Sequence, residues 1–144
     1  MQIKTIVVPT DFSEYAAQAF TWALGMAVDW NAKLVLLHVA PTFASFSYPE
    51  SMYIPDLERI EKETLEDAER RVKEFVAQKG TNQVQIETRV VRGEAMREIC
   101  HTAEREHADL IVIGSHGRTG FAHALLGSVA ERVVRHAPCP VLVV

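Results

Sequence analysis

The sequence predicts an α/β fold in which a doubly wound parallel sheet carries helices on both faces. Short runs rich in Val, Ile and Leu alternate with segments of helical periodicity throughout the 144 residues. Strict alternation of strands and helices is typical of a parallel sheet. Most of the runs are apolar without interruption, as expected of strands that are covered on both sides. We expect a single domain over residues 1–144.

Five strands are expected from the apolar runs, which occupy residues 3–8, 34–39, 84–91, 110–113 and 141–144. The third run differs from the others, because apolar and polar side chains alternate from Val84 to Val91. Alternation indicates one wetter face, so we place this strand at an edge of the sheet.

Four segments between the strands carry an apolar stripe at helical spacing. The stripes are Ala16, Phe20, Ala23, Leu24 and Ala27; Leu57, Ile60, Leu65, Ala68, Val72, Phe75 and Val76; Met96, Ile99, Cys100 and Ala103; and Leu126, Val129, Ala130, Val133 and Val134. The spacing of Ser128 and Glu131 is typical of a capping box, and that of Asp11 and Glu14 resembles one. Residues 40–55 are interpreted as a long loop, either a functional lid or a plain insertion.

Composition excludes several classes of partner. Lys and Arg number 15 against 19 Asp and Glu, a net charge of −4, so the chain has no basic excess for nucleic acid. The apolar runs are far shorter than the roughly 20 residues of a membrane helix, and the start of the chain resembles no signal peptide. Cys100 and Cys139 form neither a CxxC pair nor a disulfide framework. We expect a cytoplasmic protein that binds neither nucleic acid nor membranes.

Two segments that follow expected strands contain the candidate site. The first is Pro9-Thr10-Asp11, and the second runs from Gly114 to Arg118 and continues to Gly127-Ser128. Four of the seven glycines lie between residues 114 and 127, which indicates backbone that approaches a ligand closely. Ligands of parallel sheets bind beyond the carboxyl ends of the strands, where the strand order reverses. Loop amides and a helix N-terminus near Ser128 would attract an anion such as phosphate, although both segments could merely begin helices.

Four motifs together resemble the universal stress protein family in its ATP-binding form. They are the opening Ile6-Val7-Val8-Pro9-Thr10-Asp11-Phe12-Ser13, the strand end Leu37-His38-Val39, the spacing Gly114-x-x-Gly117-x9-Gly127-Ser128, and the closing Cys139-Pro140-Val141-Leu142-Val143-Val144. The resemblance covers essentially the whole chain. It implies the strand order 3-2-1-4-5 and a cytoplasmic stress-response module that binds an adenine nucleotide, ATP.

The same resemblance implies a set of binding residues, namely Pro9, Thr10, Asp11, Val39, Gly114, Ser115, His116, Gly117, Arg118, Gly127, Ser128 and Val129. Asp11 would meet the ribose or adenine end, the backbone of Val39 the adenine edge, and the glycine-rich segment the ribose and phosphates. Mg²⁺ or Mn²⁺ would be held mainly by the phosphates. The resemblance further implies a homodimer through residues 141–144 and an unidentified downstream protein partner.

The sequence favours an enzymatic function less than a binding function. The Walker motif GxxxxGK[ST] is absent, as are GxSxG and HExxH, and a triad of Ser115, His116 and Asp11 would depend on proximity alone. His38 lies in an apolar strand and is interpreted as a hydrogen-bonded core histidine. No catalytic residue and no protein metal ligand are predicted. A nucleotide-dependent regulatory module is favoured over a slow ATPase or phosphotransferase, because no residue stands out as a base. A structural homodimer without a ligand is the third alternative.

Overall fold

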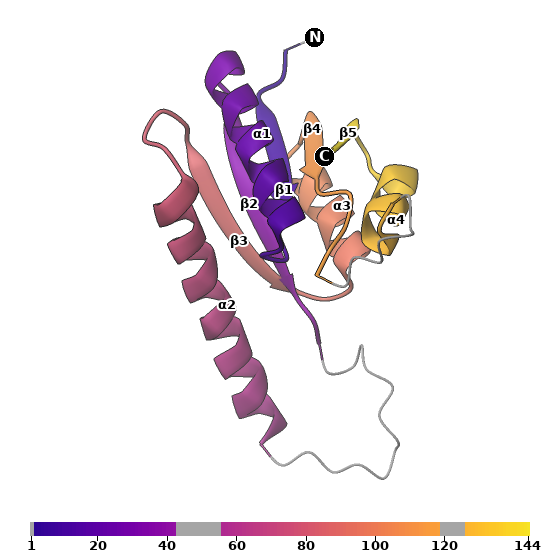
Figure 1. Ribbon diagram of the computed structural model, residues 1–144. Coiled ribbons are helices and arrows are strands. Elements are labelled where there is room, and N and C mark those ends of the chain that lie inside the picture. Colours follow the sequence, from indigo (N-terminus) through magenta and orange to yellow (C-terminus); the bar gives the residue numbers. More distant parts are fainter. Residues whose placement is uncertain (1, 43–55, 119–125) are drawn as a thin grey trace.

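The computed structural model describes residues 2–42, 56–118 and 126–144. Within these residues five strands form one parallel sheet in the order β3-β2-β1-β4-β5, as expected. The strands are β1 (Thr5–Pro9), β2 (Lys33–Ala40), β3 (Ile86–Arg92), β4 (Leu110–Ile113) and β5 (Val141–Val143). The helices are α1 (Glu14–Trp30), α2 (Leu57–Lys79), α3 (Ala95–Arg105) and α4 (Ser128–His136). Figure 1 shows α2 beside β3 at one edge of the sheet and α4 beside β5 at the other.

Two hydrophobic cores lie on the two faces of the sheet. Successive side chains of a strand point to opposite faces, so β1 contributes Ile6 and Val8 to one core and Val7 to the other. The first core packs against α1 and α2, with Phe20 and Val72 fully buried in it. The second core packs against α3 and α4. This double coverage explains why the inner strands read as uninterrupted apolar runs.

The prediction that the third strand lies at an edge is confirmed, because β3 pairs only with β2 within the described sheet. Its residues are partly exposed, and Ile86 packs against the first core while Val91 packs against the second. The strand begins at Ile86 rather than at the expected Val84, because pairing with β2 starts at Leu34 opposite Ile86. Val84 is nevertheless buried just before the strand.

Both predicted capping boxes are wrong. Helix α1 is capped by Ser13, whose side chain accepts a hydrogen bond from the backbone N–H of Ala16 at 3.2 Å, and not by Asp11. Helix α4 has Gly127 at its cap position and no side-chain capping bond. The reason is that α4 begins at Ser128 itself, so this residue occupies the first helical turn.

Two of the apolar stripes are less buried than expected. Val129 and Val134 on α4 are 36% and 48% exposed, because this helix lies at the edge of the sheet and buries only Ala130 and Val133. Within α2 only Ala68 and Val72 are fully buried. Most of the expected loop at residues 40–55 lies outside the described residues, and Ala40 ends β2. Across the residues that the structure describes, no helix is long and apolar enough to span a membrane.

Candidate functional site

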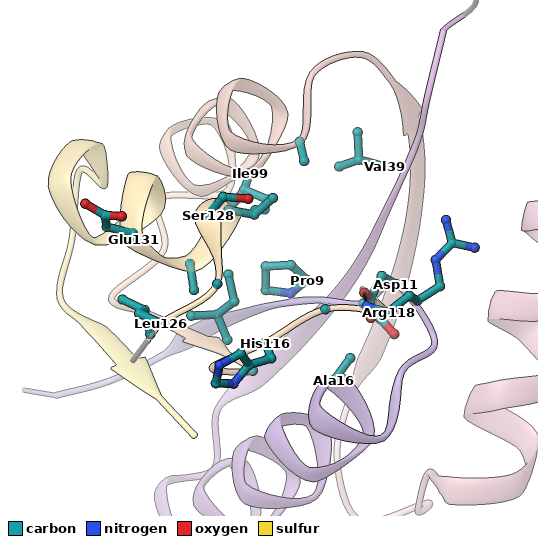
Figure 2. A pocket seen from close by; sticks show the side chains of 18 of the residues that line it. Pro9, Asp11, Ala16, Val39, Ile99, His116, Arg118, Leu126, Ser128 and Glu131 are labelled. Carbon is teal, nitrogen blue, oxygen red and sulfur yellow. Dashed lines mark hydrogen bonds between the residues drawn. The ribbon is translucent and has the colours of Figure 1, made fainter. Parts of the chain in front are cut away.

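A cleft of about 570 Å³ lies at the carboxyl ends of β1 and β4. These strands are neighbours, but β1 leads into α1 on one face of the sheet and β4 leads toward α4 on the other. The chain therefore leaves β1 and β4 toward opposite faces of the sheet, which leaves a space at their carboxyl ends. Figure 2 shows Asp11 and Arg118 at one side of the cleft and Leu126 and Glu131 at the other, with Pro9 between them.

All of the expected site residues except Ser115 line this cleft. Sequence reasoning missed the remaining lining residues, which are Ala16, Leu37, Ala95, Ile99, Ile113, Leu126, Ala130 and Glu131. Most of these are apolar and lie on expected helices and strands, where their spacing indicated core packing. Their contribution to the site follows from the positions of α3 and α4, and no local motif signals it.

Asp11 joins the two loops that meet at the cleft. Its Oδ1 accepts a hydrogen bond from the N–H of Ser13 at 3.0 Å, and its Oδ2 accepts one from the N–H of Arg118 at 2.9 Å. The carboxylate thus spans from the loop after β1 to the loop after β4. His116 Nδ1 lies 3.2 Å from Ser115 Oγ, whereas the contacts described for Asp11 are with backbone N–H groups.

Neighbouring atoms leave little room for a side chain at the glycines of the motif, most strictly at Gly114. A Cβ on Gly114 would lie 2.8 Å from the carbonyl carbon of Tyr15, and one on Gly117 would lie 2.8 Å from Asp11 Oδ2. A Cβ on Gly127 would meet the carbonyl oxygen of Ser115 at 3.1 Å. None of the three has a positive φ, so close packing and not backbone conformation is what favours glycine here. Gly120 lies outside the described residues.

Several amides of the glycine-rich segment already have partners within the protein. The N–H of Ser115 donates to the carbonyl oxygen of Val144 at 2.6 Å, and that of Gly127 donates to Ser115 at 2.7 Å. Gly127 therefore permits a close backbone approach, while its own N–H is already bonded within the protein. The N–H groups of Ser128 and Val129 have no acceptor among the described residues. The first turn of α4 is therefore available to bind an anion.

The electrostatics of the cleft depend on few charged groups. Among the described lining residues Arg118 is the only one with a permanent positive charge, and the Glu131 carboxylate is paired with Arg135 at 2.9 Å. His38 lies next to the cleft, where its Nδ1 is 2.8 Å from the carbonyl oxygen of Thr10. Burial lowers the pKa of His38, so the imidazole is neutral at pH 7. The prediction of a hydrogen-bonded histidine is confirmed, although His38 is only partly buried.

The cleft has an apolar part and a polar part. Val39 of β2, Ala95 and Ile99 of α3, and Leu126 before α4 supply apolar surface from three different segments. Asp11 and the first turn of α4 supply polar groups. A planar aromatic ring with an attached anionic group matches this combination. In the described residues no group of three His, Cys, Asp or Glu side chains could hold a metal ion.

Comparisons with known proteins agree with this architecture. The model of the Universal stress protein family matches residues 2–144. A universal stress protein of Methanocaldococcus jannaschii is 37% identical over 141 residues, which cover 98% of this chain and 81% of that protein. The structure of universal stress protein UspA from Lactobacillus plantarum has a TM-score of 0.77 and 30% identity, covering 100% of this chain and 99% of its own.

A further solved universal stress protein, determined in complex with cAMP, has a TM-score of 0.62 and 30% identity. That match covers 100% of this chain and 98% of the other. Both the fold and the family model thus agree over essentially the full length of the sequence. The chain belongs to the universal stress protein family.

Proposed function

We propose that the cleft binds an adenine nucleotide, ATP, and that the protein acts as a nucleotide-dependent regulatory module in a stress response. The observation that carries this proposal is the pairing of an apolar slot with unsatisfied amides at the start of α4, in one cleft of about 570 Å³. Support also comes from the related universal stress protein that was solved with cAMP. In this proposal residues 1–144 act as one nucleotide-binding domain.

The lining residues suggest how the ligand would be oriented. The base would occupy the apolar slot formed by Val39, Ala95, Ile99 and Leu126, with the backbone of Val39 at its edge. The Asp11 carboxylate would accept hydrogen bonds from hydroxyl groups of the ribose. The phosphates would be bound by the N–H groups of Ser128 and Val129 at the end of the α4 dipole.

The phosphates carry more negative charge than the cleft can neutralise, because Arg118 is the only permanently charged cation among its described lining residues. We therefore propose that Mg²⁺ or Mn²⁺ accompanies the nucleotide. Such an ion would be coordinated mainly by the phosphates and water, since Mg²⁺ keeps several waters and takes few protein ligands. The bound ion would reduce repulsion between the phosphates and the Glu131 carboxylate.

The first turn of α4 allows a direct test of the phosphate assignment. Ser128→Pro removes the backbone N–H of Ser128, whereas Ser128→Ala removes only the hydroxyl group. Proline is tolerated in the first helical position, and Gly127 already has the extended conformation, φ −67° and ψ 149°, that a following proline requires. The helix should therefore survive both substitutions.

We expect wild-type protein to bind MgATP in isothermal titration calorimetry. Ser128→Pro should weaken binding about 10- to 100-fold, the range for one hydrogen bond to a charged group, and Ser128→Ala should weaken it much less. Equal affinities of Ser128→Pro and Ser128→Ala would contradict the phosphate assignment. No heat of binding and no rise in Tm for the wild type at millimolar ATP would overturn the proposed function.

We also propose that the protein is cytoplasmic and forms a homodimer through β5. The residues Val141 and Val143 are partly exposed at the edge of the described sheet, and open strand edges favour pairing. Light scattering tests this proposal with a chain truncated after Cys139. Loss of the dimer mass is expected, and a truncated chain that keeps the dimer mass would refute pairing through this strand.

A further inference from the structure

Four aromatic and cationic side chains pack together beside the cleft in a cluster that we call the Phe12 stack: Phe12, His38, Phe75 and Arg71. The guanidinium carbon of Arg71 lies 4.2 Å from the centroid of the Phe12 ring, and the centroids of Phe12 and His38 are 4.6 Å apart. Phe75 approaches the Phe12 ring edge-on at 6.2 Å. Arg71 and Phe75 belong to α2, which supplies none of the described residues that line the cleft. The stack therefore connects α2 to the loop that follows β1.

Phe12 has a backbone conformation that a bulky side chain rarely adopts. Its φ is +64°, in the left-handed region, which is unfavourable for residues with a large Cβ substituent. Such a conformation persists only where surrounding contacts fix it. Locally, the N–H of Phe12 donates to Thr10 Oγ1 at 3.1 Å. The ring contacts with Arg71, His38 and Phe75 add further constraint.

The conformation of Phe12 sets the position of Asp11, its immediate neighbour. The Asp11 carboxylate must reach the N–H of Ser13 within the same turn and the N–H of Arg118 in the loop after β4. His38 also fixes this turn, through the contact between its Nδ1 and the carbonyl oxygen of Thr10. A change in the φ of Phe12 would swing the carboxylate away from Arg118.

We infer that Arg71 is a positioning residue for the cleft: its contact with the Phe12 ring keeps the loop after β1 in the conformation that aims Asp11 at Arg118. Nucleotide binding and the packing of α2 are therefore energetically coupled, and any change that withdraws Arg71 from Phe12 weakens nucleotide binding. Because coupling is reciprocal, a bound nucleotide in turn holds Arg71 in place. The coupling to nucleotide rests on the proposed function, whereas the positioning of Asp11 does not.

Neighbouring arginines on α2 provide a matched comparison. Arg71 and Arg70 are both exposed, but the ion pairs of Arg70 among the described residues are with Asp67 and Glu74 of its own helix. Arg71→Ala removes the contact with Phe12, Arg70→Ala removes an equal charge from the same helix, and Arg71→Lys keeps a cation at the ring. If Arg71→Ala acted only through charge or helix stability, Arg71→Ala and Arg70→Ala would show the same Arg118 exchange and the same ATP affinity.

Two measurements need no nucleotide. Hydrogen exchange of the Arg118 amide reports its bond to Asp11 and should accelerate about two- to fivefold in Arg71→Ala, as expected from loss of a cation–π contact at an exposed site. The pKa of His38, followed by NMR, should rise in the same variant, because burial and, to a smaller extent, the nearby positive charge of Arg71 lower it. Arg70→Ala should leave both quantities unchanged, and Arg71→Lys should lie between the wild type and Arg71→Ala.

Calorimetry with MgATP then tests the coupling, with an expected two- to fivefold loss of affinity in Arg71→Ala, smaller in Arg71→Lys and absent in Arg70→Ala. Identical Arg118 exchange in Arg71→Ala and Arg70→Ala would overturn the positioning role. Faster exchange with unchanged ATP affinity would overturn the coupling. If the wild type binds no ATP, the proposed function fails, and Arg118 exchange still decides whether Arg71 positions Asp11.

Discussion

Replacing Gly114 by alanine tests the packing of α1 against the strand that leads into the cleft. The added Cβ would lie 2.8 Å from the carbonyl carbon of Tyr15, 3.0 Å from its Cβ and 3.0 Å from its carbonyl oxygen. These atoms belong to the first turn of α1, so no side-chain rotation relieves the clash and the helix must shift. Overpacking of this kind costs about 1–3 kcal/mol. For a chain of this size we expect the Tm to fall by about 2–12 °C.

Gly25 provides the control, because it lies inside α1 and a Cβ there would meet nothing within 4 Å. The same substitution at this position should stabilise the protein by about 0.5–1 kcal/mol, since alanine has the higher helix propensity. Differential scanning calorimetry should therefore show shifts of opposite sign for Gly114→Ala and Gly25→Ala. A Tm of Gly114→Ala at or above that of the wild type would refute the argument from close approach.

Three further predictions concern the cleft, the start of α1 and an ion pair. Gly117→Ala places a Cβ 2.8 Å from Asp11 Oδ2, but this oxygen can rotate away, so the Tm should change little. Calorimetry should show about tenfold weaker ATP binding, and an affinity equal to that of the wild type would contradict this prediction. Ser13→Ala removes the α1 cap and should cost about 1 kcal/mol in urea unfolding, and an unchanged midpoint would count against the cap. The hydrogen bond from Lys33 lowers the pKa of Glu106, so the stability from this pair is present above the ordinary value of 4.5 and is lost as the pH falls through the lowered pKa. Thermal unfolding from pH 6 to pH 3 should consequently lose less stability in Glu106→Gln than in the wild type, whereas parallel curves would exclude this contribution.

The proposed ligand would bind segments that lead to helices on both faces of the sheet. Asp11 follows a strand whose loop leads into α1, while Ser128 begins α4 on the opposite face. A molecule bound to both segments would tie together the two halves of the sheet at the point where the chain separates them. Binding should therefore raise the stability of the whole fold.

The sequence by itself determined the order of the elements and the double coverage of the sheet. Hydrophobic periodicity is a local property, so the apolar runs at Leu34–Leu37 and Leu110–Ile113 are informative without knowledge of their neighbours. The alternation in the third run was likewise enough to place β3 at an edge. The strand order and the binding residues came from the family resemblance, because periodicity does not specify which strands are adjacent.

Only the tertiary structure decided which groups of the motif remain available and which further segments contribute to the cleft. The amides of Ser115 and Gly127 look free in the sequence, but distant chain segments and the fold of the loop provide their acceptors. Ile99 lines the cleft because α3 packs against β1 and β2, which are distant from it in sequence. The left-handed conformation of Phe12 depends on Arg71, 59 residues away along the chain. Contacts over such separations are set by packing of the whole domain, which local patterns of residues do not encode.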